Sequence, residues 1–551
     1  MLSGYARPRP AQGLWRPWKG QWRAHRQPRL LHGVRAEASD SGAAVAAAEQ
    51  FRQTGFAKGD AELRRLLNRI YSASDARTQQ RRQLLQAPVR GVPVYVMLPL
   101  DTVWLIERDG RSQPVLIREK AMEVGLEALR AAGVEGVMVD VWWGIAEHAG
   151  ARQYDFSAYR RLFEQVAAKG LKIQAVMSFH AAGGNVGDTC RISLPKWVLE
   201  AGDRDPNIFY TDRAGVRNRE CISLGCDEVP VLGGRTPVQA YTDFMTSFAD
   251  EFNDMLGSVI TEVTVGLGPA GELRYPSYPE GDGRWRFPGV GEFQCYDGYM
   301  LADLKRVALA AGHPEWGNAG PHDAGHYNAI PRETGFFHTN GSWDSEYGNF
   351  FLSWYSGLLT RHADRILAIA SEILTARCRP RRMKERRELS DGQMMFSFKP
   401  AVQLGVKLAG VHWWYRSRSH AAELTAGYYN PRDVNGYRPI LEVLSQHSAC
   451  INFTCVEMRD CEHPPESKCS PQGLLAQVIG AAMELGVPVA GENALQRYDR
   501  YAFDRIAESA FGQNAMAGRL EKVTFLRMGD MMYDNWEAFS GFLRRLTCPP
   551  Q

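Results

Sequence analysis

Apolar runs rich in β-branched residues recur along the chain, and most are followed by stretches whose apolar residues have helical spacing. The first run is "VPVYVMLPL" from Val92, and the other seven end at Asp140, His180, Gly268, His412, Thr454, Glu492 and Arg527. Such runs are typical of strands buried on both faces of a parallel sheet. The helical stretches Glu119–Gly133 and Tyr159–Gly170 end in glycine, as a helix C-terminus does. Eight strands alternating with helices predict an α/β fold, the (β/α)8 or TIM barrel.

Polar side chains stand at the ends of these runs. Seven of the eight runs are apolar until their last residue or two and then end in His, Asp, Glu, Thr or Arg. In (β/α)8 barrels the active site is built at the C-terminal ends of the strands. Two intervening segments are long, about 85 residues after His180 and more than 120 after Glu272, and loops of that length are usually functional. We therefore expect long loops that form a deep active-site mouth.

The N-terminal region differs from the rest of the chain. Residues 1–36 hold eight basic residues and no acidic one, and they lack a continuous apolar segment. This pattern favours an organelle transit peptide over a secretory signal, with a disordered basic tail as the alternative. We interpret 37–91 as a linker with a short helix and 92–551 as a single catalytic domain. These residues alone do not separate chloroplast from mitochondrion.

Composition and charge exclude several classes of protein. The 551 residues carry 65 Lys+Arg and 62 Asp+Glu, and without residues 1–36 the balance is mildly acidic, which gives no support for nucleic-acid binding. No run of about 18 uncharged apolar residues indicates a membrane span. The ten cysteines form no CxxC pair, and no His, Asp or Glu cluster has zinc or calcium spacing. We expect neither a metal nor a cofactor, while redox control through a cysteine pair stays open.

The segment "GLGPAG" (266–271) matches the glycine pattern of dinucleotide-binding turns. That function requires a helix to begin at the motif. Pro276, Pro279 and Pro288 follow closely and exclude a helix there. We interpret the segment instead as a strained, glycine-rich turn that presents Glu272.

Two glutamates lie at ends of predicted strands, Glu272 in "GPAGELRYPSY" and Glu492 in "VAGENAL". Either glutamate alone would be explained best by a structural salt bridge. Two carboxylates at one barrel mouth predict glycosidic bond cleavage, with one as acid and the other acting on water or on carbon. The aromatic residues Trp142, Trp143, Tyr275, Trp413, Trp414 and Tyr415 could supply flat faces for sugar rings.

Several segments together resemble one family. "FHAAGGNVGD" (179–188), "GLGPAGELRYPSY" (266–278), "GVMVDVWWGI", "GVHWWY", "HAAELTAGYYN", "NFTCVEMRD", "AGENAL" and "FLR" are similar, in order and spacing, to the β-amylases of glycoside hydrolase family 14, plastid type. The resemblance runs from about Val92 to the C-terminal region. It implies a monomeric plastid enzyme, without cofactor, that cleaves α-1,4-glucosidic bonds of starch-derived glucans and releases β-maltose from their non-reducing ends.

The resemblance also implies residue roles. Glu272 would be the general acid, protonated before reaction in apolar or anionic surroundings, and Glu492 the ionised base that activates water. Because the family inverts the anomeric configuration, we expect the two carboxyl groups to lie about 6.5–9.5 Å apart. The implied substrate-binding residues are Asp140, His180 and Asp188 at the terminal glucose, Lys407 and His412 at the next sugars, Thr454 on an inner loop, Asn493 and Ala494 beside the base, and Arg527. Residues 183–188 would form a lid with glycine hinges.

The chain departs from the family pattern at three places. Ala182 stands where cysteine is common, and Gln496 stands where proline is usual. Residues 377–393 form a basic insertion, which we interpret as a solvated loop, with a docking surface or a retained non-native segment as alternatives. A catalytically inactive glucan sensor on the same fold is the competing functional hypothesis. The presence of both glutamates, the lid and the sugar-binding positions favours the enzyme.

Overall fold

The computed structural model describes residues 91–185, 187–377, 402–512 and 519–547. The predicted transit peptide, the linker up to residue 90 and the basic insertion beyond Arg377 lie outside the described residues. Among the described helices, none combines the length and apolarity that crossing a bilayer requires.

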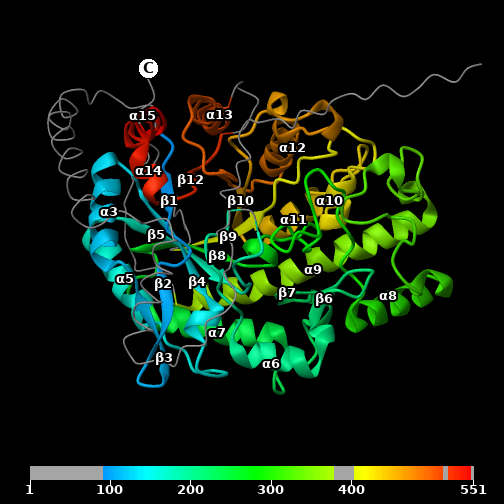
Figure 1. The fold of residues 1–551 in the computed structure, drawn as a ribbon, viewed down its shortest axis with the longest axis horizontal. Helices are drawn as coiled ribbons and strands as arrows, with labels where there is room; N and C mark the ends of the chain where they lie inside the picture. Colours follow the sequence, from blue (N-terminus) through cyan, green and yellow to red (C-terminus); the bar gives the residue numbers. More distant parts are fainter. Residues whose placement is uncertain (1–90, 186, 378–401, 513–518, 548–551) are drawn as a thin grey trace, which may run out of the picture. The chain divides into compact units, whose positions relative to one another are not determined.

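A closed barrel of eight parallel strands forms the centre of the described chain (Figure 1). The strands are β1 (Val94–Met97), β4 (Gly136–Trp142), β5 (Lys172–Ser178), β8 (Ile260–Val265), β9 (Gln403–Leu408), β10 (Ala449–Phe453), β11 (Val489–Glu492) and β12 (Val523–Phe525). The barrel closes where Val94 of β1 is in register with Val523 of β12. Each strand begins in one of the eight predicted runs, and only β4 extends beyond its run, to Trp142, so the predicted (β/α)8 barrel is confirmed.

Each barrel strand is followed along the chain, directly or after loop elements, by one of eight helices. These helices are α3 (Glu119–Ala132), α5 (Ser157–Ala168), α7 (Pro237–Glu251), α9 (Glu346–Arg377), α11 (Arg438–Gln446), α12 (Pro471–Glu484), α13 (Arg500–Phe511) and α15 (Trp536–Thr547). Helix α3 shows how helical spacing of apolar residues leads to burial of one helix face. Its residues Met122, Leu126 and Leu129 recur at helical spacing and are buried. The helix ends at Gly133, whose φ of 92° is left-handed and favours glycine, as predicted.

The remaining elements belong to the loops and were not predicted. They are the hairpins β2 (Val103–Arg108) with β3 (Arg111–Leu116) and β6 (Phe209–Thr211) with β7 (Arg217–Ile222), and the helices α4 (Trp143–Ala146), α6 (Lys196–Arg204), α8 (Gly298–Ala310), α10 (Ala421–Ala426) and α14 (Asp530–Asp534). Short 3-10 turns are η1 (Pro206–Ile208), η2 (Leu224–Cys226), η3 (Pro269–Gly271), η4 (Pro314–Gly317), η5 (Pro331–Glu333), η6 (Ser342–Asp344), η7 (Asp460–Glu462) and η8 (Pro465–Ser467).

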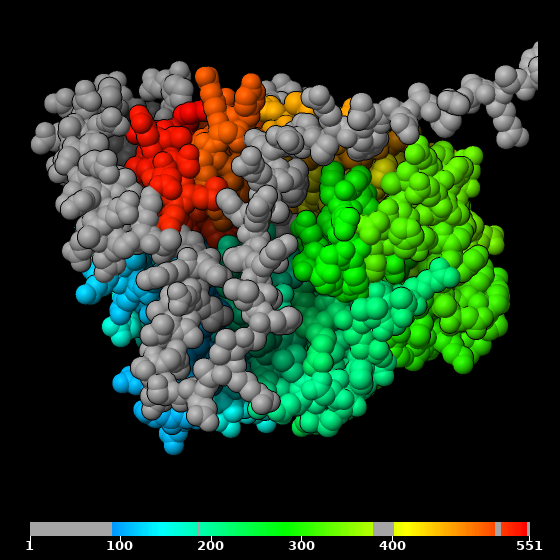
Figure 2. Space-filling model, viewed as in Figure 1, coloured from blue at the N-terminus to red at the C-terminus, as the bar shows by residue number. Residues whose placement is uncertain are grey.

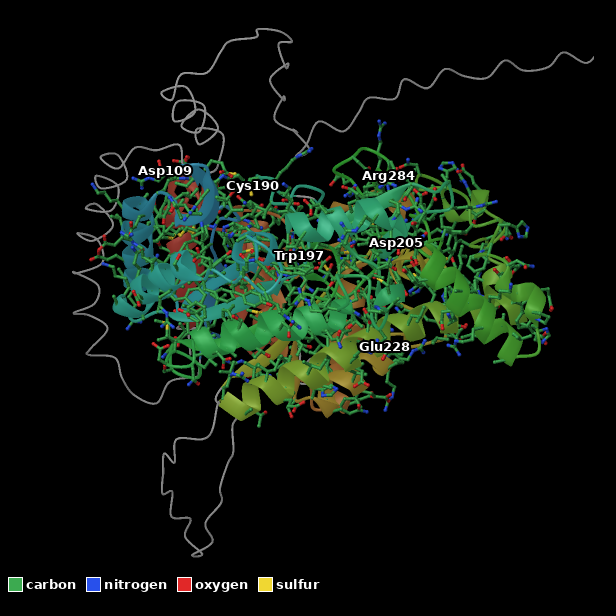
Figure 3. The ribbon with its side chains drawn as sticks, turned by 90° about the horizontal axis from the view of Figure 1, so that it is seen from below. Asp109, Cys190, Trp197, Asp205, Glu228 and Arg284 are labelled. Atoms are coloured by element: carbon green, nitrogen blue, oxygen red, sulfur yellow. The ribbon has the colours of Figure 1, made fainter. Side chains whose placement is uncertain are left out.

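The two longest excursions, after β5 and after β8, pack against each other. Asp212, beside β6, accepts hydrogen bonds from the Tyr327 hydroxyl at 2.8 Å and from Arg284 Nη1 at 2.9 Å. Arg284 is labelled in Figure 3, and Figure 2 shows the two excursions as adjoining teal-green and green surfaces. The long loops therefore stabilise one another.

The barrel interior contains a polar group as well as apolar side chains. Glu262 on β8 is 1% exposed, forms an ion pair with Lys522, and accepts a hydrogen bond from Asn452 at 2.8 Å. A buried carboxylate is tolerated only when it is paired and hydrogen-bonded, as here. The ion pair with Lys522 and the hydrogen bond from Asn452 give Glu262 a structural role inside the barrel.

Candidate active site

The turn after β8 presents Glu272. Ala270 has a φ of 55° and Gly271 a φ of 74°, so a non-glycine residue is held in the left-handed region two positions before Glu272. Such strain is costly and clusters at functional sites, and it matches the predicted strained turn. No α-helix begins here, since the next one is α8. Glu272 forms an isolated parallel bridge with Lys407, and Leu273 N donates to Lys407 O at 2.9 Å, which places Glu272 beside the end of β9.

A cation is the nearest charged partner of Glu272. Arg274 Nε donates to Glu272 Oε2 at 2.6 Å, and the arginine side chain is 3% exposed. The surroundings of Glu272 therefore include a buried cation, whereas apolar or anionic surroundings were predicted. The role of Glu272 as general acid stays a prediction.

Lys407 holds the second carboxylate. Its Nζ donates to Glu492 Oε1 at 2.9 Å, and both residues are almost completely buried. Burial lowers the pKa of Lys407, but the charges of Glu492, Asp140 and Glu272 outweigh it, so its pKa lies above the ordinary value. One ammonium group therefore lies among three of the predicted site carboxylates.

Buried polar atoms without a partner gather at the predicted site. Four predicted residues contribute them: His180 Nδ1, His412 Nε2, Glu492 Oε2, and Arg527 Nε and Nη1. Buried polar groups in native proteins are nearly always hydrogen-bonded, so each such atom calls for a ligand or a water. A molecule rich in hydroxyl groups would satisfy both donors and acceptors in this set.

The two predicted histidines are neutral hydrogen-bonding groups. Burial lowers the pKa of His180 to about 4 and that of His412 to about 3. His180 follows β5, and its ring meets the edge of Trp142 with centroids 5.1 Å apart. Asp140 on β4 accepts from Ser178 Oγ at 2.9 Å. Imidazole nitrogens and carboxylate oxygens are both suited to hydrogen bonds with sugar hydroxyls.

Asp188 organises the predicted lid. Its Oδ2 accepts from the backbone N–H groups of Gly183, Gly184 and Asn185 at 2.7, 3.0 and 3.0 Å. Burial raises the pKa of Asp188, and these bonds oppose the shift. Gly183 has a φ of 112°, which favours glycine. The carboxylate thus stabilises the lid, and its contact with glucose stays a prediction.

Gly410 connects Thr454 and His412 through hydrogen bonds of its backbone. Thr454 Oγ1 accepts from Gly410 N at 2.7 Å, and His412 Nδ1 lies 2.9 Å from Gly410 O. The loop after β9 is thereby tied to the end of β10. This contact brings together two predicted sugar-binding residues from different strands.

Asn493 has a structural role. Its Oδ1 accepts from Leu526 N at 2.7 Å, and its Nδ2 donates to Leu495 O and Leu526 O at 2.7 and 3.1 Å. The amide therefore joins the strand end that carries Glu492 to the one that carries Arg527. Ala494 N also bonds within the protein, to Glu457 at 3.1 Å, so substrate contacts at both positions stay predictions.

Sequence reasoning missed two carboxylates that position the site. Glu220 Oε1 on β7 accepts from Asn185 Nδ2 at 2.6 Å and from Ala270 N at 2.8 Å. Glu457 is fully buried and accepts from Leu495 N at 2.8 Å. Burial raises the pKa of each to about 7. Glu457 lies in the family-like segment "NFTCVEMRD", whereas no sequence pattern marks Glu220.

Most of the predicted sugar-stacking aromatics belong to the core. Trp142, Trp143, Tyr275, Trp413 and Trp414 are each less than 9% exposed. The ring of Trp143 packs against Trp197, which is labelled in Figure 3, and Tyr275 stacks on Tyr355 at 3.8 Å. Tyr415 is partly buried and donates to Gln477. The expectation that these rings form exposed sugar platforms is wrong, because the long loops cover them.

Comparisons with known proteins show the family of the chain. The profile of glycosyl hydrolase family 14 matches residues 95–381 and 385–548. The chain is 53% identical to β-amylase 2, chloroplastic, of Oryza sativa subsp. japonica, over 83% of this chain and 77% of that protein. It is 49% identical to β-amylase 1, chloroplastic, of Arabidopsis thaliana, over 83% and 76%. The crystal structure of the catalytic domain of β-amylase from Paenibacillus polymyxa matches with a TM-score of 0.63 and 28% identity, over 84% of this chain and 100% of that one.

Proposed function

Because the chain belongs to glycosyl hydrolase family 14, we propose that it is an exo-acting hydrolase that releases maltose from starch-type α-1,4-glucans. The observation that supports this proposal is the position of Glu272 and Glu492, which both lie beside Lys407. Both glutamates follow barrel strands, one in the turn after β8 and one at the end of β11. The unpartnered polar atoms of His180, His412 and Arg527 supply groups that can bind sugar hydroxyls.

Glu492 is the general base of this proposal. Its Oε1 is engaged by Lys407, while its buried Oε2 has no partner. Oε2 is therefore the atom that accepts a proton from the attacking water. The hydrogen bond from Lys407 fixes the orientation of the carboxylate, so that Oε2 stays free for the water.

Glu272 is the general acid. Its Oε2 accepts from Arg274 Nε, so Oε1 is the oxygen that carries the proton and delivers it to the glycosidic oxygen. Water attacks the anomeric carbon from the opposite face as the bond to the leaving oxygen breaks. A separation of about 6.5–9.5 Å between the carboxyl groups leaves room for that water and gives inversion, with β-maltose as product.

The remaining predicted residues bind the glucan. They are Asp140, His180 and Asp188 at the terminal glucose, Lys407 and His412 at the next sugars, Thr454 at the leaving-group side, Asn493 and Ala494 beside the base, and Arg527 at the end of β12. The lid at 183–188 closes over the chain end and excludes bulk water from the reacting bond.

Maltose release from soluble starch tests the proposal. Glu272→Gln and Glu492→Gln should each lower kcat by about 10²–10⁴-fold, the usual contribution of a general acid or base. Optical rotation of fresh product should show β-maltose first. Wild-type rates in Glu272→Gln, or initial α-maltose, would contradict the mechanism. Glucan binding without any maltose release by the wild type would instead establish the inactive sensor.

The proposal also covers the location of the protein in the cell and its oligomeric state. Two rice relatives and one from Arabidopsis thaliana are named as chloroplastic. Together with the basic residues 1–36, this supports a plastid enzyme. The resemblance to the family implies that it is a monomer. Import of a fluorescent protein fused behind residues 1–91 into isolated chloroplasts tests the location. Light scattering of the purified chain tests the monomer.

A further inference from the structure

Three soft-metal ligands meet at the side of the site where His412 lies. One ring nitrogen each from His412 and His463, and Sγ of Cys469, all lie within 4.8 Å of one another. They come from the loop after β9 and from the segment between β10 and α12. The sequence showed no metal motif because these positions are distant along the chain and lack zinc-finger spacing.

The backbone holds the three residues in place. Ser470 N donates to His412 O at 3.0 Å, and Trp414 N donates to Ser467 O at 2.9 Å. These bonds fasten the Cys469 segment alongside the His412 loop. The ring centroids of His463 and His412 lie 4.7 Å apart, and this contact positions His463, the third ligand. The group is therefore assembled before any ligand binds.

Two ring nitrogens in this group are buried and have no partner. They are His412 Nε2 and His463 Nε2. The His412 side chain is more than nine-tenths buried. Its Nδ1 is engaged by Gly410 O at 2.9 Å, which leaves the Nε2 lone pair for another ligand. A carbonyl that fixes one imidazole nitrogen so that the other can bind metal is a recurring arrangement at metal sites.

We propose that His412, His463 and Cys469 bind one divalent transition-metal ion of the Zn²⁺ class. Imidazole and thiolate ligands are those that Zn²⁺ prefers, and three protein ligands leave a fourth position for water. On binding, the S–H bond of Cys469 breaks, its proton passes to solvent and the sulfur bonds to the metal. Asp460 accepts from Ser470 Oγ at 2.9 Å and adds a negative charge beside the site.

The metal would inhibit glucan hydrolysis, and this part rests on the proposed function. His412 is one of the residues proposed to contact the sugars on the leaving-group side. A metal on Nε2 occupies the nitrogen that would meet the glucan. Bound metal should therefore raise the KM for maltopentaose.

Calorimetric titration of Zn²⁺ into the untagged, metal-free full chain tests binding without substrate. We expect one site in the wild type and a loss of affinity of about 100-fold or more in Cys469→Ser and in His463→Gln, since each removes a ligand. The matched control is Cys461→Ser, because Cys461 is an exposed thiol close in sequence that the site does not use. Co²⁺ in place of Zn²⁺ should give a thiolate-to-metal charge-transfer band, which Cys469→Ser abolishes.

Two results would overturn the site. One is unchanged Zn²⁺ affinity in both ligand variants, and the other is a loss confined to Cys461→Ser, which would show adventitious binding to the exposed thiol. His463→Gln should release maltose at the wild-type rate without metal and should resist inhibition by Zn²⁺. If no chain releases maltose but the metal titrations behave as expected, the proposed function fails and the metal site stands.

Discussion

Lys407 Nζ lies 2.9 Å from Glu492 Oε1, and neither side chain is more than 8% exposed. The lysine comes from β9 and the glutamate from the end of β11, so the pair spans β10 between them. Removing one partner of a buried ion pair is strongly destabilising, because the other charge is then left uncompensated. The pair therefore connects the stability of the barrel with the position of the proposed base.

Replacing the lysine should lower activity and stability together. In Lys407→Met, Glu492 Oε1 loses its hydrogen-bond donor, so the orientation of the proposed base is no longer fixed. We expect kcat for maltose release to fall about 10–100-fold, the range for a lost hydrogen bond to a charged group. Stability should fall by about 3–5 kcal/mol, because one charge stays buried alone. Maltose release measures the first effect and urea unfolding the second.

Lys522→Met is the matched control for that variant. Lys522 pairs with Glu262, a carboxylate inside the barrel that is not among the predicted site residues. This variant should lose stability in a similar way while kcat stays close to the wild-type value. Equal losses of kcat in both variants would show that Lys407 acts only through stability.

The lid is connected to the acid through Asn185. Asn185 Nδ2 donates to Glu220 at 2.6 Å, and Asn185 Oδ1 accepts from Arg274 Nη2 at 3.2 Å. Asn185→Ala removes both bonds, so we expect kcat/KM for maltopentaose to fall about 10–100-fold, the range of one to two lost hydrogen bonds to charged groups. Amide exchange at 183–188 should become faster. Thr189→Ala, an exposed position just beyond the lid, should leave both measurements unchanged.

Backbone conformation limits substitution in the lid. A Cβ at Gly183 would lie 2.6 Å from Arg191 Cγ, and its φ of 112° is unfavourable for other residues. Gly184 has no left-handed φ, and the atom nearest to its Cβ position is Glu220 Oε2 at 3.6 Å. Gly183→Ala should therefore lower kcat/KM by about tenfold or more, equivalent to roughly 1–2 kcal/mol of strain. Gly184→Ala should retain nearly full activity, and comparable losses in both would contradict this account.

Glu457 should make stability depend on pH. Burial raises its pKa from 4.5 to about 7, so between these values the folded state binds a proton that the unfolded state has released. The stabilising contribution of the residue is thus fully present below about pH 4.5 and is lost as the pH rises to about 7. The loss is on the order of 3 kcal/mol.

Glu457→Gln should abolish that dependence. At pH 5 the variant should be less stable than the wild type by about 1–3 kcal/mol, because the amide offers one acceptor for the two N–H groups of Ala494 and Leu495. Urea unfolding of both proteins at pH 5 and pH 8 measures the difference. The wild type should lose its advantage over the variant at pH 8, and a constant advantage would contradict the shifted pKa.

The sequence alone predicted the barrel and singled out the two glutamates. Runs of β-branched residues and helical spacing are local patterns, and every barrel strand begins in a predicted run. Glu272 and Glu492 stand out because a polar residue ends an apolar strand, and the family-like segments imply their roles. In a (β/α)8 barrel the C-terminal ends of all eight strands lie on one face, so both glutamates are expected on that face.

Only the tertiary structure decided which side chains meet. Lys407 with Glu492, Arg274 with Asn185, and His412 with His463 and Cys469 are contacts between distant segments, and no local pattern encodes them. Burial is decided in the same way: Trp142, Trp143 and Tyr275 were expected to face sugars, yet the long loops enclose them. Local periodicity reports secondary structure, whereas charge pairing, burial and ligand geometry depend on how the loops pack over the closed barrel.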